Sequence, residues 1–85
     1  MKHAYVPINC EFHDVLEARA VQRRIVALHY LDEDGQTRLT HSRIADVYAQ
    51  SSMEFIRLEQ GAPIRLDRII GIDGVRVSDF SKANS

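Results

Sequence analysis

The sequence predicts a small α+β domain, mainly β, in which an N-terminal helix packs on a small, bent antiparallel sheet or partly open barrel. Three observations lead to this fold class. A helical apolar period occupies the first part of the chain, short apolar segments separated by turn residues fill the remainder, and 85 residues are too few for two hydrophobic cores. We therefore expect residues 1–85 to form a single domain.

The start of the chain is expected to be extended and to lead into the helix. Pro7 cannot lie inside a helix or a central strand, so residues 1–8 are predicted to form an extended lead-in. Asn9 is a favourable N-cap, and Glu11 falls in the first helical turn, where the helix dipole favours an anion. These signals predict a helix over about residues 10–20.

The predicted helix has two sides of different chemistry. Its apolar residues recur at i, i+3, i+4 and i+8, which places them on one core-facing stripe: Phe12, Val15, Leu16 and Ala20. The opposite side carries three carboxylates, Glu11, Asp14 and Glu17. Carboxylates on the outside of a surface helix are ordinary, so this spacing does not by itself assign a partner to the acidic side.

After the helix, the pattern changes to that of short strands. Residues 22–32 carry apolar side chains on both faces, as a central strand does. Asp34 and Gly35 then predict a hairpin turn, because both positions tolerate positive φ. Residues 36–43 alternate only weakly, which indicates a more exposed strand, and a break is expected at residues 46–52.

The second half of the chain is predicted to add three more strands. We expect them over residues 53–59, 62–70 and 75–78, with a frayed end over residues 81–85. Gly71 and Gly74 frame the turn before the last of these strands.

Composition narrows the possible functions and locations. The chain is 45% hydrophobic and 27% charged, as ordinary globular proteins are. Its formal net charge is −1, so it lacks the basic excess of a dedicated nucleic-acid binder, and direct nucleic-acid binding is not favoured. The sequence shows neither a secretion signal nor an apolar run long enough to cross a bilayer. We expect a cytoplasmic protein, with the monomer as the favoured state.

The sequence shows no catalytic or metal-binding constellation, so we expect neither an enzyme nor a cofactor. The histidines form no His-x-x-x-His pair, and the single cysteine, Cys10, has no Cys-x-x-Cys partner for a metal. Cys10 also lacks the base and the orienting group that a catalytic nucleophile needs. We expect it to be a small buried residue beside the helix cap.

Seven arginines of the predicted helix end and sheet could form a basic patch: Arg23, Arg24, Arg38, Arg43, Arg57, Arg65 and Arg68. Arginines on the outside of a sheet more often pair with neighbouring acids, and we expect that arrangement here.

The N-terminal part of the chain resembles a known family. Residues 5–10 read Tyr-Val-Pro-Ile-Asn-Cys and residues 14–17 read Asp-Val-Leu-Glu. Rof (YaeO) proteins carry a tyrosine, one variable residue and Pro-Ile-Asn-Cys, followed shortly by Asp-x-Leu-Glu. The turn at residues 34–35 and the segment at residues 64–69 also resemble that family's central hairpin and its Arg-Leu-Asp-x-Ile strand.

The resemblance implies a fold like that of Sm and Hfq proteins and binding to the Rho hexamer. The protein would occupy the N-terminal primary RNA-binding domain of Rho, block RNA loading and inhibit Rho-dependent termination. An acidic helix can compete there for arginines and lysines that otherwise contact phosphates. The residues expected to bind Rho are Asp14 and Glu17, which match the family motif, their neighbour Glu11, and Asn9 and Cys10. The alternative function is an Sm-like module that binds RNA directly through the arginines of its sheet.

Overall fold

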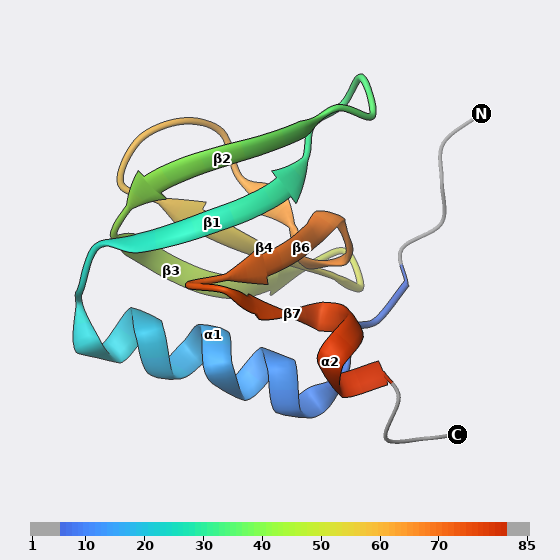
Figure 1. Cartoon of the computed structure of the whole chain (residues 1–85), viewed down its shortest axis with the longest axis horizontal. Helices are drawn as coiled ribbons and strands as arrows, with labels where there is room; N and C mark the ends of the chain where they lie inside the picture. Colours follow the sequence, from blue (N-terminus) through green and yellow to red (C-terminus); the bar gives the residue numbers. More distant parts are fainter. Residues whose placement is uncertain (1–5, 82–85) are drawn as a thin grey trace.

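The computed structural model describes residues 6–81 and shows a small α+β fold made mainly of strands, which confirms the coarse fold class (Figure 1). The elements, in chain order, are α1 (Cys10–Gln22), β1 (Val26–Leu31), β2 (Thr37–Ser42), β3 (Ile44–Gln50), β4 (Met53–Leu58), β5 (Ile64–Arg65), the 3₁₀ turn η1 (Leu66–Arg68), β6 (Ile69–Ile72), β7 (Val75–Arg76) and α2 (Val77–Ser81). Residues 6–9 lie in neither a helix nor a strand. The rest of the predicted lead-in, and nearly all of the predicted frayed end, lie outside the described residues.

The strands form two antiparallel sheets, with the orders β2-β1-β6-β7 and β3-β4-β5. The chain passes between the sheets at two places, at Arg43 between β2 and β3 and at η1 between β5 and β6. The expectation of one bent sheet is therefore corrected to two sheets. No closed barrel forms within residues 6–81, because no hydrogen-bonded ladder joins the two sheets.

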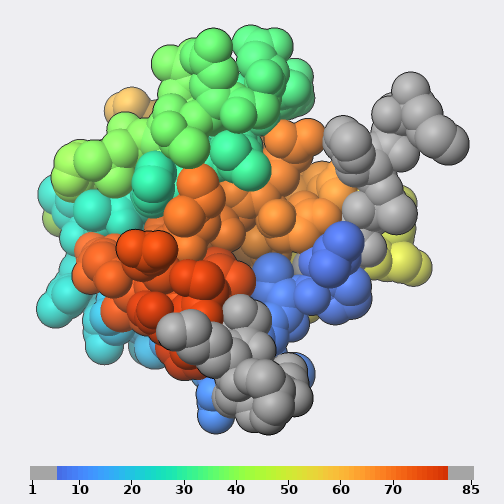
Figure 2. Space-filling view, turned by 45° about the vertical axis from the view of Figure 1, so that its right-hand side comes forward, coloured from blue at the N-terminus to red at the C-terminus, as the bar shows by residue number. Residues whose placement is uncertain are grey.

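The core lies between the two sheets and α1. It consists of ten buried apolar residues: Phe12, Leu16, Val26, Leu28, Ile44, Ile56, Leu58, Leu66, Ile69 and Ile72. The predicted core stripe of the helix is confirmed, since Phe12 and Leu16 are fully buried and Val15 packs against the same cluster. Phe80 of α2 meets Phe12 edge to face, with ring centroids 5.8 Å apart. Figure 2 shows the resulting contact, with the red C-terminal segment beside the blue start of the chain.

The helix is longer than predicted, and β1 begins later. α1 continues to Gln22 and ends at Arg23, whose φ of 56° is left-handed and whose N–H donates to the Ala20 carbonyl. Ile25, expected in a buried strand, is 58% exposed in the connection to β1. The apolar run after Ala20 did not mark the boundary because Val21 and Ile25 suit a strand as well as a helix end.

The first hairpin is confirmed, but its turn differs from the expected one. Of the two expected turn residues, Asp34 and Gly35, only Gly35 has a positive φ. Its N–H donates to the Asp32 carbonyl. The Asp32 carboxylate accepts hydrogen bonds from the amides of Asp34 and Gln36 and from Arg38 Nε. The bond from Arg38, followed by those from the backbone, holds the pKa of Asp32 below its ordinary value. β2 is exposed, as predicted.

The break predicted at residues 46–52 is wrong, because most of this segment belongs to β3. β3 pairs with β4 and is joined to it by Ser51 and Ser52, both with positive φ. Such two-residue turns usually contain Asn-Gly or Asp-Gly, so the Ser-Ser pair gave no turn signal. An irregularity in the register between Ile44 and Asp46 shifts the alternation by one residue and conceals the strand pattern.

The strand predicted over residues 62–70 is divided into β5, η1 and β6, which lie in different sheets. Gly71 lies inside β6 and does not frame a turn; a Cβ there would come within 2.8 Å of the Val75 carbonyl oxygen.

Asp73 and Gly74, both with positive φ, make the turn to β7. The last predicted strand ends at Arg76, after which α2 begins. The Asp79 carboxylate accepts a hydrogen bond from the Arg76 amide.

Asp73, in the turn between β6 and β7, connects α1 with β1. Its carboxylate accepts hydrogen bonds of 2.9 Å from the Ala27 amide and from Arg19 Nε, and its own N–H donates to the Ala27 carbonyl. Partial burial raises the pKa of Asp73, but the Ala27 amide and Arg19 lower it by more, so the pKa lies below its ordinary value. The charged carboxylate therefore stabilises the fold.

We expect Asp73→Asn to lower stability by about 1 kcal/mol at neutral pH, because the ion pair with Arg19 is lost while asparagine retains the left-handed backbone and an acceptor for Ala27. Since the folded-state pKa is depressed, this contribution is present above the unfolded-state pKa and disappears as pH falls through the folded-state value. Urea denaturation of both proteins at decreasing pH measures the difference. A difference that persists in strong acid would contradict the electrostatic explanation.

Candidate partner-binding site

Asn9 fixes the start of α1 and, with it, the position of the acidic residues. Its φ and ψ are extended, and its side-chain oxygen accepts hydrogen bonds from the amides of Glu11 (2.7 Å) and Phe12 (3.4 Å). The predicted cap is therefore confirmed. Asn9 is half-buried, and its side-chain oxygen is used by the cap.

Cys10 is exposed, and the expectation that it is buried beside the cap is wrong. The reason is helical geometry. Cys10 precedes the buried Phe12 by two residues, which is about 200° around the helix axis, so it lies on the solvent side. The thiol is thus beside the acidic residues and outside the core.

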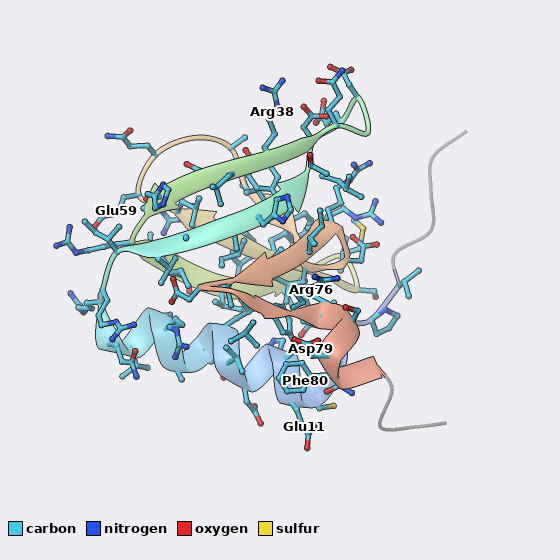
Figure 3. All side chains as sticks on the ribbon, viewed as in Figure 1. Glu11, Arg38, Glu59, Arg76, Asp79 and Phe80 are labelled. Carbon is cyan, nitrogen blue, oxygen red and sulfur yellow. The ribbon has the colours of Figure 1, made fainter. Side chains whose placement is uncertain are left out.

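The three predicted carboxylates all lie on the exposed side of α1, but their surroundings differ. The Glu11 and Asp14 side chains form no hydrogen bond or ion pair within residues 6–81, and Figure 3 shows Glu11 pointing away from the sheets. Glu17 lies 3.7 Å from His13 Nδ1, and His13 Nε2 lies 3.2 Å from Glu54 of β4. The surface therefore holds two uncompensated carboxylates and a third that shares a histidine.

His13 and Glu54 belong to this surface and were not predicted. The i,i+4 spacing of His13 and Glu17 was a readable signal for their contact. Glu54 had no such signal, because it reaches the helix only through the pairing of β4 with β3. The arrangement places carboxylates on both sides of one imidazole.

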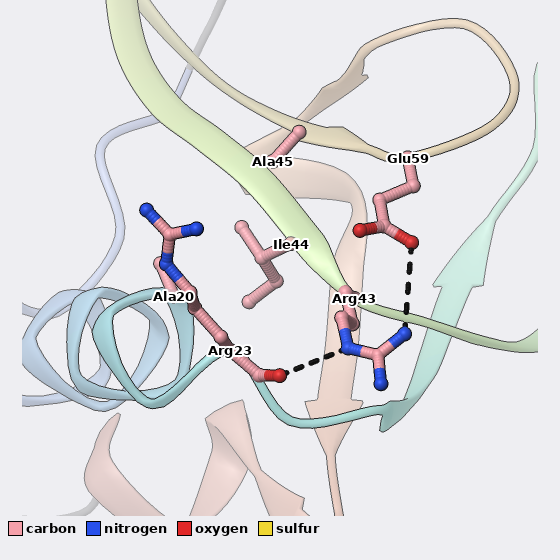
Figure 4. A pocket seen from close by; sticks show the side chains of 6 residues that line it. All are labelled: Ala20, Arg23, Arg43, Ile44, Ala45 and Glu59. Carbon is pink, nitrogen blue, oxygen red and sulfur yellow. Dashed lines mark hydrogen bonds and ion pairs between the residues drawn. The ribbon is translucent and has the colours of Figure 1, made fainter.

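Two of the three arginines that follow the acidic side are paired with Asp73, Arg19 at 2.9 Å and Arg24 at 3.9 Å. The Arg23 side chain forms no ion pair within residues 6–81. Arg43 Nε donates to the Arg23 carbonyl, and an Arg43 terminal nitrogen lies 4.0 Å from Glu59 (Figure 4). These groups border a hollow of about 480 Å³ between the end of α1 and β3, lined by Ala20, Arg23, Arg43, Ile44, Ala45 and Glu59.

The predicted pairing of sheet arginines with neighbouring acids is seen for four of the seven. Ion pairs of 4.0 Å or less join Arg24 to Asp73, Arg38 to Asp32, Arg43 to Glu59 and Arg65 to Asp67. Most of the arginine charge is therefore compensated locally and does not form one continuous patch.

A second hollow of about 430 Å³ extends the acidic surface toward β3. It is lined by Glu17, Ala20, Val21, Arg23, Ala45, Asp46 and Val47. Val21 is 81% exposed, an unusual position for a large apolar side chain at the end of a helix. The sequence pattern missed this residue because it was assigned to neither the core stripe nor the acidic side.

Within residues 6–81, no three His, Cys, Asp or Glu side chains converge as a metal site would require. No helix in this part of the chain is long and apolar enough to cross a membrane. Comparisons of the chain with models of known protein families and with curated proteins gave no match.

Replacing the cap should destabilise the helix that carries the carboxylates. We expect Asn9→Ala to lower the free energy of unfolding by about 1 kcal/mol, because the amides of Glu11 and Phe12 lose their acceptor. Asn9→Ser should retain most of the stability, and Cys10→Ala should change it by less than about 0.5 kcal/mol. Chemical denaturation compares the variants. Equal stabilities for Asn9→Ala and Asn9→Ser would exclude the capping role.

Proposed function

We propose that this protein is an inhibitory binding module of the Rof type, which docks on the N-terminal RNA-binding region of Rho and prevents RNA from loading. The observation that carries the proposal is the pair of exposed carboxylates, Glu11 and Asp14, which have no intramolecular partner in the described part of the chain. The sequence likeness at residues 5–10 and 14–17 supplies the identity of the partner. The protein acts by occupation of a surface and not by catalysis, in the cytoplasm of a bacterium.

The construction of α1 supports this proposal. Phe12 and Leu16 anchor one side of the helix in the core, and Asn9 fixes its first turn, so the carboxylates are held in position before binding. A preorganised side chain loses less conformational entropy when a partner binds it. Charge-assisted hydrogen bonds to the arginines and lysines of an RNA-binding groove would then replace those made by phosphates. A helix followed by antiparallel strands is also compatible with the Sm-like fold that we propose.

We expect the purified protein to bind Rho and to suppress its RNA-stimulated ATP hydrolysis, with an effect that weakens as salt rises. Asp14→Arg combined with Glu17→Arg should weaken Rho binding at least about tenfold, because each replacement converts a favourable charge contact into a repulsive one. Titration calorimetry measures the affinity, and circular dichroism checks the fold.

The matched control is the double variant Glu33→Arg with Asp34→Arg, which makes the same change in net charge on the exposed tip of the first hairpin. This control should retain Rho binding if the affinity depends on contacts with α1. It should lose binding as strongly as the first variant if the affinity depends only on the net charge of the protein. Equal effects of the two double variants, or no effect of the first, would remove the acidic side of α1 from the mechanism.

The alternative, direct RNA binding by an Sm-like module, is favoured by one feature of the second sheet. Tyr48 and Phe55 stack with ring centroids 5.4 Å apart and an interplanar angle of 20°, and Arg65 lies opposite Phe55 in register, so the three share a sheet face. Aromatic rings beside arginine are typical of surfaces that stack bases. Arg65 is paired with Asp67, however, which weakens its attraction for phosphate.

A gel shift with short pyrimidine-rich RNA, in the absence of Rho, separates the two functions. We expect no shift at micromolar protein, because the arginine charge is locally compensated. A shift that Tyr48→Ala abolishes would instead support the RNA-binding alternative.

A further inference from the structure

One edge of β2 has no strand beside it. In the ladder with β1, Asp32 N–H donates to the Gln36 carbonyl, and antiparallel alternation then directs the backbone groups of Arg38, Thr40 and Ser42 toward β1. The backbone groups that point the other way belong to Thr37, Leu39 and His41. No strand within residues 6–81 pairs with them, since β2 is the first strand of its sheet.

This edge lacks the features that usually protect an exposed strand from pairing. β2 has six residues, contains neither lysine nor proline, and pairs with β1 without an irregularity in register. Its arginine, Arg38, is bound to the Asp32 carboxylate at 2.7 Å. Leu39 presents a side chain that is 64% exposed. An unprotected edge with an exposed leucine indicates a pairing surface.

A hollow of about 850 Å³ lies beside β2, between the first hairpin and the loop that joins β4 to β5. Figure 1 shows this loop behind β2, and Glu59 at its start donates its N–H to the carbonyl of Arg43, which follows β2 directly. Thr40 of β2 lines the hollow, together with the apolar side chains of Tyr30, Leu31, Phe55, Leu58, Ala62, Pro63 and Ile64. A strand added to β2 would thus direct alternate side chains toward an apolar lining.

The rim of the hollow is acidic at the hairpin tip. The Glu33 and Asp34 side chains are exposed and form no hydrogen bond or ion pair within residues 6–81. Of the basic side chains of the lining, Arg65 pairs with Asp67, and Arg68 donates to the Asp32 carbonyl oxygen, a neutral acceptor that leaves its charge in place. The lining carries three carboxylates against two guanidinium groups, so the charge at this end is negative on balance, which favours a cationic side chain and disfavours a phosphate backbone.

A second copy of the chain does not suit this edge. Antiparallel self-pairing centred on Leu39 would bring Gly35 of the other copy opposite Arg43, whose carbonyl oxygen already accepts the Glu59 amide. Pairing centred on Arg38 would place two guanidinium groups side by side, and the Asp32 carboxylate bound to each reduces their repulsion without removing it. One of the two simplest symmetric registers is thus obstructed by the chain, and the other is weakened by the remaining like-charge repulsion.

We propose that the free edge of β2 and the adjoining hollow bind an extended peptide of a partner protein, in which a lysine or arginine is followed by alternating apolar residues. The peptide adds to the sheet through the backbone groups of Thr37, Leu39 and His41, and its apolar side chains enter the hollow. Its cationic residue meets Glu33 and Asp34. This surface lies across the molecule from α1, so it functions independently of the acidic helix (Figure 1).

The test is a titration of ¹⁵N-labelled protein with an acetylated hexapeptide in which one lysine precedes alternating valine and threonine. We expect shifts of the Thr37, Leu39 and His41 amide signals and slower hydrogen exchange at these amides. A peptide with glutamate in place of the lysine should bind about fivefold more weakly. Absence of shifts at these amides, or shifts confined to α1, would overturn the proposal.

Leu39→Pro tests the main-chain contact. It removes an N–H that faces away from β1, a position where an edge strand tolerates proline, and should weaken peptide binding about tenfold. Leu39→Thr retains the N–H and should bind within about twofold of the original protein. If Leu39→Pro does not fold, Glu33→Lys with Asp34→Lys provides the second measurement and should weaken binding about fivefold.

Several results would overturn the proposal. Binding that is unchanged by Leu39→Pro, or by the hairpin-tip reversal, would exclude pairing at this edge. Concentration-dependent shifts of the β2 amides without peptide would identify a second copy as the occupant. Displacement of the peptide by single-stranded RNA would assign the edge to a nucleic acid.

The β2 variants also separate this proposal from the proposed function. If they still bind Rho, the β2 edge and the acidic side of α1 are separate surfaces.

Discussion

The arrangement of helix and sheet depends on the hydrogen bonds that Asp73 makes with Ala27 and Arg19. The turn at Asp73 and Gly74 places a carboxylate beside the Ala27 N–H at the start of β1, and the Asp73 N–H beside the Ala27 carbonyl oxygen. The same carboxylate fixes a side chain from the last turns of α1. One residue thereby connects three segments that are separated by up to 54 positions in the chain. The orientation of the acidic side of the helix follows from this connection and from the burial of Phe12 and Leu16.

Local signals predicted those elements whose pattern and boundaries agree. The helix start was predictable because cap, first-turn acid and apolar period coincide at Asn9, Glu11 and Phe12. The turn at Gly35 was predictable because the Asp34-Gly35 pair is itself a local turn signal. β3 was not, since a register irregularity and a Ser51-Ser52 turn removed both of the signals that identify a hairpin. The division of residues 62–70 depends on which sheet each part joins, and pairing between distant segments is not encoded in a local period.

The candidate site shows the same limit. The exposure of Glu11, Asp14 and Glu17 could be predicted because it follows from helical spacing alone. Contacts with residues of other elements could not be predicted in this way, because Glu54 reaches His13 only when β4 lies beside β3 and the helix packs over them. Which charges are free and which are compensated is therefore a property of the fold. Within residues 6–81, carboxylates without a hydrogen bond or ion pair lie on the first turns of α1, at the tip of the first hairpin and at Asp46 of β3.

The exposed position of Cys10 has a practical consequence. It is the only cysteine in the chain, and its thiol lies in the first turn of α1 beside Glu11 and Asp14. A maleimide fluorophore attached there would label one defined position without any background substitution. Its emission would respond to a macromolecule that covers the start of the helix and would be insensitive to a peptide at β2. Because the single thiol lies in the first turn of α1, its fluorescent label would report whether a partner covers the acidic side of the helix.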